Sequence, residues 1–166
     1  MNTYTEFSKI YLDACCLIRF FDAQTQERVR NETQAIAWIL SRVYTGNWFW
    51  VASEVLRDEV NQGLDLVQRD HINEMLTCAS QTISVGAMEI ARAKSLEVLG
   101  FKRQDALHLA CAESGSADIF FTTDDRLLKS ARRVRPQIHM RVENPYTWLI
   151  GVTQNEYTRN ADAGDA

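Results

Sequence analysis

Carboxylate side chains follow the most apolar runs of this chain, at places where they could act together. Asp13 comes directly after Ile10–Leu12, and Asp124 follows Ile119–Phe121 by three residues. Asp105 lies on an apolar run that is long enough for a buried helix. A carboxylate at the edge of a buried element costs desolvation energy unless a partner compensates its charge. These acids therefore call for a partner, and a cation is the simplest one.

A fourth apolar run, residues 48–52, is followed by three acids that compete for the same role. Glu54 and Asp58 are four residues apart, so they share one helix face that should be exposed to solvent. Glu59 instead lies at the margin of the apolar face of the same helix. The spacing favours Glu59 as the acid that joins Asp13, Asp105 and Asp124.

Short β-type runs alternate with helical patterns along the chain. The predicted strands cover residues 9–12, 48–52, 82–85, 119–121 and 138–142, and the last of them is expected at a sheet edge. Asn31 and Gln34 form a capping-box pattern, which predicts a helix from there to about residue 44. This order predicts an α/β domain with a mainly parallel central sheet. In such sheets, ligands bind beyond the carboxyl ends of the strands, near a topological switch point.

The four selected acids, Asp13, Glu59, Asp105 and Asp124, could converge in one cleft. Like charges this close would force some of them to protonate unless a cation is bound. Mg²⁺ and Mn²⁺ prefer such oxygen ligands, and one or two of these ions can activate water and stabilise the leaving oxygen in phosphodiester cleavage. Each acid alone could equally be a turn residue, a helix-surface acid or an N-cap. Four such coincidences are much less probable than one.

Composition sets outer bounds on the class of protein. The 166 residues are enough for one domain with a sizeable core, which we expect to cover residues 1–150. From residue 151 the composition turns polar, which predicts a flexible C-terminal tail over residues 151–166. The net charge of −4 argues against a protein held to nucleic acid mainly by its overall field, although it leaves room for a local basic patch.

Location and redox state can also be predicted. No apolar run reaches the ~18 residues that a membrane helix needs, and the N-terminus is too polar for a secretion signal. Four cysteines without CxxC spacing lie inside apolar runs, which predicts reduced core residues: Cys15, Cys16, Cys78 and Cys111. A cytoplasmic protein is therefore expected.

Four motifs, taken in order, resemble the PIN-domain family, and within it they are most similar to the VapC-like ribonuclease toxins of type II toxin–antitoxin systems. They are IYLDACCLIRFFD, which contains Asp13; SEVLRDE, which runs from Ser53 to Glu59; DALHLA, which begins at Asp105; and ADIFFTTDD, which contains Asp124. Each motif is weak by itself, but the ordered set is fairly specific.

The resemblance implies a three-layer α/β/α sandwich and Mg²⁺- or Mn²⁺-dependent cleavage of RNA. It also implies a homodimer and a partner antitoxin protein. Carried over position by position, it implies four metal-binding and catalytic acids: Asp13, Glu59, Asp105 and Asp124. Thr122 would be a supporting hydroxyl, and Asp125 is the weaker choice beside Asp124. Cys15 and Cys16 depart from the family pattern, which often has Ser or Thr at these positions.

Several other groups allow two readings. Lys102 and Arg103 lie beside Asp105 and are placed to meet an RNA phosphate. The basic run from Arg126 to Arg135 is read as a solvated helix face, with phosphate or partner contact as the alternative. His108 is read as a packed or hydrogen-bonded helix residue, because metal-bound water needs no histidine.

Three classes of function compete. The first is a metal-dependent endoribonuclease, and the second is a PIN-fold binding or assembly module with little or no catalysis. A dehalogenase-type phosphatase fits poorly, because it needs a second aspartate two residues after Asp13, where this chain has Cys15.

Overall fold

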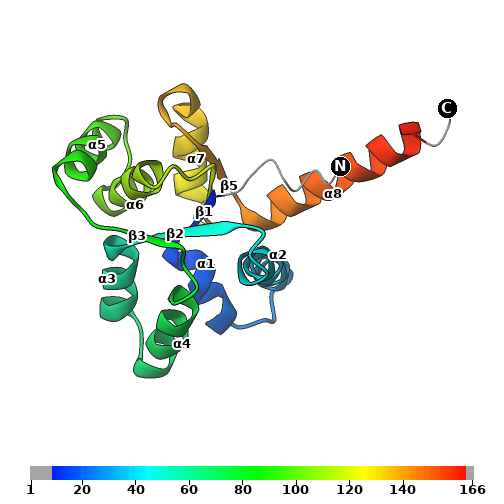
Figure 1. Cartoon of the computed structure of the whole chain (residues 1–166), viewed down its shortest axis with the longest axis horizontal. Coiled ribbons are helices and arrows are strands. Elements are labelled where there is room, and N and C mark those ends of the chain that lie inside the picture. The colour runs from blue at the N-terminus through cyan, green and yellow to red at the C-terminus, as the bar shows by residue number, and fades with distance from the viewer. Residues whose placement is uncertain (1–8, 164–166) are drawn as a thin grey trace.

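The computed structural model describes residues 9–163, apart from the side chains of residues 156 and 160–163. Its centre is a parallel sheet of five strands in the order β3-β2-β1-β4-β5. The strands are β1 (Lys9–Leu12), β2 (Phe49–Ser53), β3 (Gln81–Ile83), β4 (Ile119–Phe121) and β5 (Arg141–Glu143). Helices cover both faces of this sheet (Figure 1), which confirms the predicted α/β/α sandwich with a mainly parallel sheet.

One face of the sheet is covered by helices from both ends of the chain. They are α1 (Ala14–Ile18), the short 3₁₀ helix η2 (Arg19–Phe21), α2 (Glu27–Tyr44), α4 (Leu66–Leu76) and α8 (Pro145–Ala163). The other face is covered by α5 (Ala87–Val98), α6 (Arg103–Ser114) and α7 (Asp125–Arg133), followed by the 3₁₀ helix η3 (Arg135–Gln137). Helix α3 (Glu54–Gly63) contributes to both cores, because Leu56 and Val55 point to opposite clusters.

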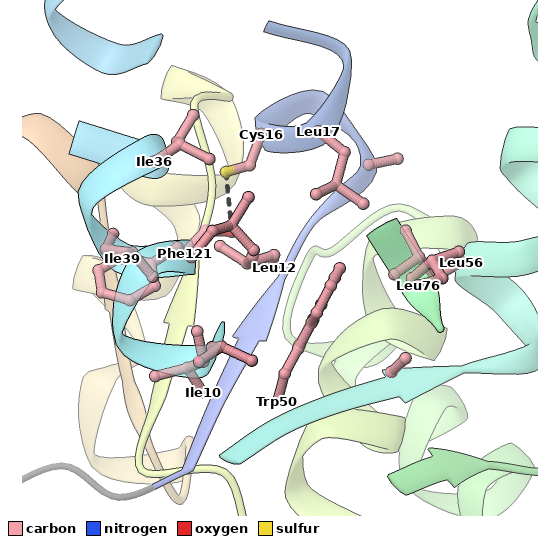
Figure 2. Packing of buried hydrophobic residues seen from close by; sticks show 14 of the residues in the cluster. Ile10, Leu12, Cys16, Leu17, Ile36, Ile39, Trp50, Leu56, Leu76 and Phe121 are labelled. Carbon is pink, nitrogen blue, oxygen red and sulfur yellow. Dashed lines mark hydrogen bonds between the residues drawn. The ribbon is translucent and has the colours of Figure 1, made fainter. Parts of the chain in front are cut away.

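Strand alternation explains why two separate cores form. Successive side chains of a strand point to opposite faces, so Ile10 and Leu12 enter the first cluster while Tyr11 enters the second. Figure 2 shows Ile36 and Ile39 of α2 beside Ile10 and Leu12 on the first face. On the second face, the Tyr11 ring stacks on Phe120 with centroids 5.1 Å apart. All three strand residues are buried, and each contributes roughly 1.5–3 kcal/mol through burial.

Tertiary packing overrode local patterns at two helix boundaries. Helix α2 begins at Glu27, not at the Asn31–Gln34 capping-box pattern, and the extra turn buries Val29. The prediction of a flexible tail from Gly151 is wrong as far as residue 163, because helix α8 continues through this segment. Trp148 is only 4% exposed and anchors α8 in the first cluster, which the polar composition of the segment did not reveal. Residues 1–8 and 164–166 of the predicted domain and tail lie outside the described residues.

Of the other sequence predictions, the structure confirms some and contradicts one. The strand near residue 142 is β5, and it forms an edge of the sheet as expected. Cys15, Cys16 and Cys111 lie in or against the cores as free thiols, whereas Cys78 is exposed at the end of α4, so its assignment to the core is wrong. The charged side chains of the basic run on and after α7 are exposed, which confirms a solvated helix face. Within residues 9–163, no helix is both long and apolar enough to cross a membrane.

Candidate functional site

The predicted acids on β1 and β4 lie where the strand order reverses. Chain order runs outward from β1 in both directions, so the carboxyl ends of β1 and β4 flank the topological switch point. The Asp13 backbone N–H donates to the Phe121 carbonyl at 3.0 Å, which ties the two strand ends together. Asp13 is 8% exposed and caps α1, accepting from the Ala14 N–H at 2.8 Å. Parallel pairing therefore holds Asp13 beside the residues that follow β4.

Thr122 joins two of the predicted acids. Its hydroxyl donates to Asp13 Oδ2 at 2.8 Å and accepts from the Asp124 backbone N–H at 3.1 Å. The Cys15 thiol lies 3.4 Å from Asp13 Oδ2 and 3.3 Å from the Thr122 hydroxyl, so the cysteine contacts the acid where the family often has Ser or Thr. Thr122 therefore supplies a hydroxyl hydrogen bond to Asp13, with the Cys15 thiol beside it.

Asp105 comes to the same place from the first turn of α6. Burial, followed by the charges of Asp13 and Asp124, raises the pKa of the Asp105 carboxyl to about 6. Lys102, on the turn before α6, acts in the opposite direction through its charge. Three neighbouring carboxylates are an oxygen-rich set, which matches the ligand preference of Mg²⁺ or Mn²⁺. The residues present therefore fit a hard divalent cation.

Glu59 approaches from α3 and meets a histidine. Its Oε2 lies 2.7 Å from His108 Nε2, and this hydrogen bond, opposed by burial, lowers the pKa of the Glu59 carboxyl. One ligand atom each from Asp13, Glu59 and His108 lie within 4.8 Å of one another. Glu59 thus lies next to Asp13. Asp105 interacts with Asp13 and Asp124 through its charge, and Asp124 is joined to Asp13 through the Thr122 hydroxyl.

Glu54 and Asp58, the two α3 acids that the sequence did not favour, are both exposed. Glu54 is exposed and accepts from the Ser84 hydroxyl at 3.0 Å and from the Val85 N–H at 3.1 Å, which fastens the segment after β3. Asp58 is exposed to solvent. Helical spacing alone was enough to separate Glu59 from both, because only Glu59 lies next to the buried face. Ser53 caps α3, accepting from the Leu56 N–H at 3.1 Å.

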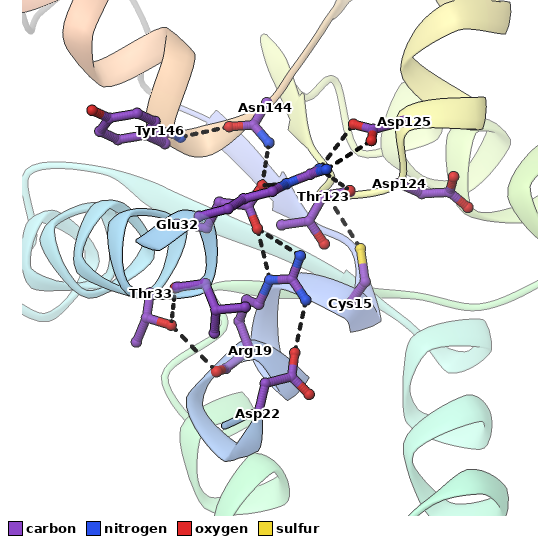
Figure 3. A network of polar contacts seen from close by, with 12 residues as sticks. Cys15, Arg19, Asp22, Glu32, Thr33, Thr123, Asp124, Asp125, Asn144 and Tyr146 are labelled. Atoms are coloured by element: carbon purple, nitrogen blue, oxygen red, sulfur yellow. Dashed lines mark hydrogen bonds and ion pairs between the residues drawn. The ribbon is translucent and has the colours of Figure 1, made fainter. Parts of the chain in front are cut away.

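Asp124 and Asp125 are adjacent in sequence but belong to different environments. The two carboxylate oxygens of Asp125 each accept from Arg28 at 2.8 Å, and this pairing lowers the pKa of Asp125. Asp124 points away from this ion pair in Figure 3, and its Oδ1 caps α7 by accepting from the Arg126 N–H at 2.8 Å. The Arg28 pairing makes Asp125 the poorer metal ligand and supports the choice of Asp124.

The surface around the acids is open and mixed in character. A groove of about 590 Å³ runs beside Glu59, lined by Val55, Asp58, Glu59, Gln62, Gly63, Val85, Gln104 and Leu107. Lys102 and Arg103 are both exposed at the start of α6. Only Lys102 contributes to the electrostatics of Asp105. Lys102 is therefore the better placed of the two to meet a phosphate at the acids.

Two features of the site were missed or undervalued from the sequence. Arg28 and Tyr11 gave no functional signal, because Arg28 looks like a helix-surface cation and Tyr11 like a core aromatic. Arg28 in fact also donates to the Thr123 carbonyl at 3.1 Å, so it holds the segment that carries Asp124. The reading of His108 as a hydrogen-bonded helix residue is confirmed, since the ring is 1% exposed with both nitrogens engaged.

The raised pKa of Asp105 leads to a stability prediction. In the unfolded chain this carboxyl has a pKa of 3.8, against about 6 in the folded protein. The folded state therefore binds more protons between these values, so stability falls as pH rises from about 4 to about 6. After allowance for solvent screening of this half-exposed group, the loss at neutral pH is about 1 kcal/mol.

An Asp105→Asn variant in EDTA at pH 7.5 is thus expected to melt roughly 2–4 °C above the wild type. The advantage should disappear below pH 4, and added Mg²⁺ should stabilise the wild type more than the variant. Thermal melts followed by circular dichroism across this pH range measure the effect, with the exposed Asp58→Asn as the control. A variant that melts below the wild type at pH 7.5 in EDTA would contradict the assignment.

Comparisons with known proteins agree with this geometry. The family model of the PIN domain matches residues 10–133, which is well over half of the chain. The fold is similar to the crystal structure of VapBC2 from Rickettsia felis bound to a DNA fragment from their promoter, with a TM-score of 0.52 and 16% identity. That match covers 82% of this chain and 98% of the other. No curated protein matches the chain in sequence. With the motifs in order and the family match extending from β1 into α7, the chain belongs to the PIN domain family.

Proposed function

We propose that the protein is a Mg²⁺- or Mn²⁺-dependent endoribonuclease and acts as the toxin of a toxin–antitoxin pair. The observation that carries this proposal is the position of Asp105 near Asp13 and Asp124 at the switch point, where burial and then repulsion by these two acids raise the pKa of Asp105 to about 6. A bound divalent cation offsets this repulsion. No other group of acids among the described residues combines this position with this degree of crowding.

Each residue of the site has a distinct role in this proposal. Asp13, Glu59, Asp105 and Asp124 hold the cation, which activates a water molecule and stabilises the leaving oxygen of the phosphodiester. Thr122 keeps the Asp13 carboxylate oriented through its 2.8 Å hydrogen bond. Lys102 and Arg103 would contact backbone phosphates of the RNA, because exposed cations beside an acidic site attract the substrate that the acids repel.

A protein partner is part of the same proposal. The solved structure that this fold resembles is that of VapBC2 bound to a DNA fragment from their promoter. From this likeness we propose that an antitoxin protein binds this chain, that the chain functions as a homodimer, and that it acts in the cytoplasm. Size-exclusion chromatography with light scattering, alone and with the product of a neighbouring gene, measures both forms of association.

A PIN-fold binding or assembly module is the second candidate. The crowded acids disfavour it, because each partly desolvated carboxylate lowers stability and a binding module gains nothing from that cost.

The discriminating assay incubates the purified protein with a mixed RNA pool in Mg²⁺, in Mn²⁺ and in EDTA. Metal-dependent cleavage by the wild type, with none in EDTA and none by Asp105→Asn, is the expected result. The thermal melts described above establish that the variant is folded. If the wild type cuts no RNA with either metal, the nuclease assignment is wrong and the binding module takes its place.

A further inference from the structure

A buried chain of polar side chains runs from the sheet to the candidate site. Ser53 Oγ lies 2.6 Å from the Tyr11 hydroxyl, and that hydroxyl lies 2.7 Å from His108 Nδ1. His108 Nε2 lies 2.7 Å from Glu59 Oε2. Ser53, Tyr11 and His108 are each at most 1% exposed. Polar groups this deeply buried are costly unless every one has a partner, and here each of them does.

The direction of the hydrogen bond between His108 and Glu59 follows from the charge on Glu59. A carboxylate that binds a cation is ionised, so Glu59 can only accept in its 2.7 Å contact with His108. His108 Nε2 therefore carries a proton and donates it. With a neutral ring, Tyr11 donates to Nδ1; with a charged ring, Nδ1 donates to Tyr11, whose hydroxyl turns to Ser53. Donation to Glu59 is the same in both cases.

Glu59 needs such a restraint more than the other acids do. Asp13 is held by Thr122 and by the Ala14 N–H, and Asp124 by the N–H groups at the start of α7. Glu59 has a longer side chain, is 38% exposed and lies on α3, outside the strand ends. Its freedom of rotation is greater, so ordering it at a metal costs more conformational entropy unless a partner holds it beforehand.

His108 reaches Glu59 from a rigid base. Its ring meets the Tyr11 ring edge-on with centroids 5.9 Å apart, and Tyr11 lies on β1 two residues before Asp13. The strand that carries Asp13 therefore also fixes the ring that contacts Glu59. This arrangement ties two acids from different elements to one strand.

We propose that His108 is a positioning residue, held by Tyr11 and Ser53, which preorganises the Glu59 carboxylate beside Asp13 for a divalent cation. This inference rests on the proposed metal site and goes beyond it by assigning a role to three residues that do not bind the cation themselves. The same effect is known for hydrogen-bonded partners of metal ligands in general, where loss of the partner weakens metal binding about 10–100-fold.

The test measures Mn²⁺ binding to the full chain by isothermal titration calorimetry, without RNA. His108→Leu removes the donor to Glu59 and is expected to weaken Mn²⁺ binding by about 10-fold or more. His108→Gln places an amide N–H near the position of Nε2 and is expected to restore binding to within about 3-fold of the wild type. Tyr11→Phe keeps the packing but removes the hydroxyl that contacts the His108 ring, so Mn²⁺ binding is expected to weaken by only about 3-fold.

Two further variants separate positioning from a general effect on folding. Leu109→Ala, in the next position of α6, removes buried apolar surface without touching the polar chain, so it should lower the melting temperature but leave Mn²⁺ binding unchanged. Glu59→Gln combined with His108→Leu should bind Mn²⁺ no more weakly than Glu59→Gln alone, because His108 acts only through Glu59.

The inference is overturned if His108→Leu binds Mn²⁺ as the wild type does, if the two substitutions add, or if Leu109→Ala weakens binding equally. If His108→Leu does not fold, the Mn²⁺ binding of His108→Gln and Tyr11→Phe decides. Weaker Mn²⁺ binding by Tyr11→Phe together with unchanged binding by His108→Gln supports the positioning role. Any other pattern rejects it. Mn²⁺ binding that responds as expected in a wild type that cuts no RNA would reject the nuclease and leave the inference standing. A wild type that binds no Mn²⁺ rejects the inference together with the metal site.

Discussion

An Asp13→Asn protein is expected to fold like the wild type and to lose RNA cleavage by a factor on the order of 10³, equivalent to about 4 kcal/mol of transition-state stabilisation. Asparagine is as good an N-cap as aspartate, so the contact with the Ala14 N–H at the start of α1 survives. The substitution removes one negative charge from the centre of the acid cluster. It leaves the shape of the site in place, but the amide NH2 at the Oδ2 position can only donate to the Thr122 hydroxyl, so the hydrogen bond that Thr122 donates to Asp13 is lost or reversed. Single-turnover cleavage of a labelled RNA in saturating Mg²⁺ measures the loss.

Asp125→Asn is the matched control for this result. It neutralises an acid in the same part of the molecule, but one that is paired with Arg28 outside the cluster. Cleavage within about 3-fold of the wild type is expected, because an exposed ion pair contributes little. Equal losses in the two variants would mean that charge near the site, not ligation by Asp13, determines the rate.

Replacement of Glu32 by alanine is expected to lower the free energy of unfolding by about 3–5 kcal/mol. Glu32 is 1% exposed, and its carboxylate is paired with Arg19 at 2.7 Å and Arg28 at 2.9 Å (Figure 3). It also accepts from the Asn144 amide at 2.8 Å. Removing the one acid leaves two arginines and an amide without their shared acceptor. Urea unfolding at pH 7 measures the change in stability.

Asp22→Asn tests whether burial is the cause. Asp22 pairs with Arg19 at 2.8 Å, as Glu32 does at 2.7 Å, but the Asp22 side chain is 36% exposed. The expected loss is under about 1 kcal/mol, because water screens the pair and replaces it. A Glu32→Ala protein as stable as the Asp22→Asn protein would show that the network contributes nothing through burial.

Loss of Glu32 is also expected to weaken metal binding at the candidate site. Arg28 bridges Glu32, Asp125 and the Thr123 carbonyl, so it links α2 to the turn that carries Asp124. Loosening Arg28 should weaken Mn²⁺ binding in Glu32→Ala by a smaller factor than loss of an acid. The same calorimetric titration used for His108 measures this effect.

Local pattern was sufficient for the elements whose own residues decide their structure. Apolar runs identified β1, β2 and β4, and two-residue alternation divided Ile10 and Tyr11 between the two cores. Helical periodicity separated Glu59 from Glu54 and Asp58. These predictions succeeded because strand and helix periods are set within a few residues of the chain.

The same kind of pattern failed where distant contacts decide the outcome. The start of α2 depends on the burial of Val29, and the course of α8 depends on Trp148, which packs in the first core; sequence composition records neither. Cys78 shows the reverse case, since an apolar neighbourhood in sequence ended at an exposed helix terminus. Local propensity is a weak determinant wherever tertiary packing competes with it.

By itself, the sequence determined which acids could serve this protein, because the position of each one after a strand or on a helix face is a local property. The tertiary structure alone decided their environments. Asp105 acquires its raised pKa from burial and from the charges of Asp13 and Asp124, Glu59 is held by a histidine 49 positions away, and Asp125 is paired with an arginine 97 positions away. Charge and hydrogen bonding act across space, so residues that are far apart in the chain determine which carboxylates remain available to a metal.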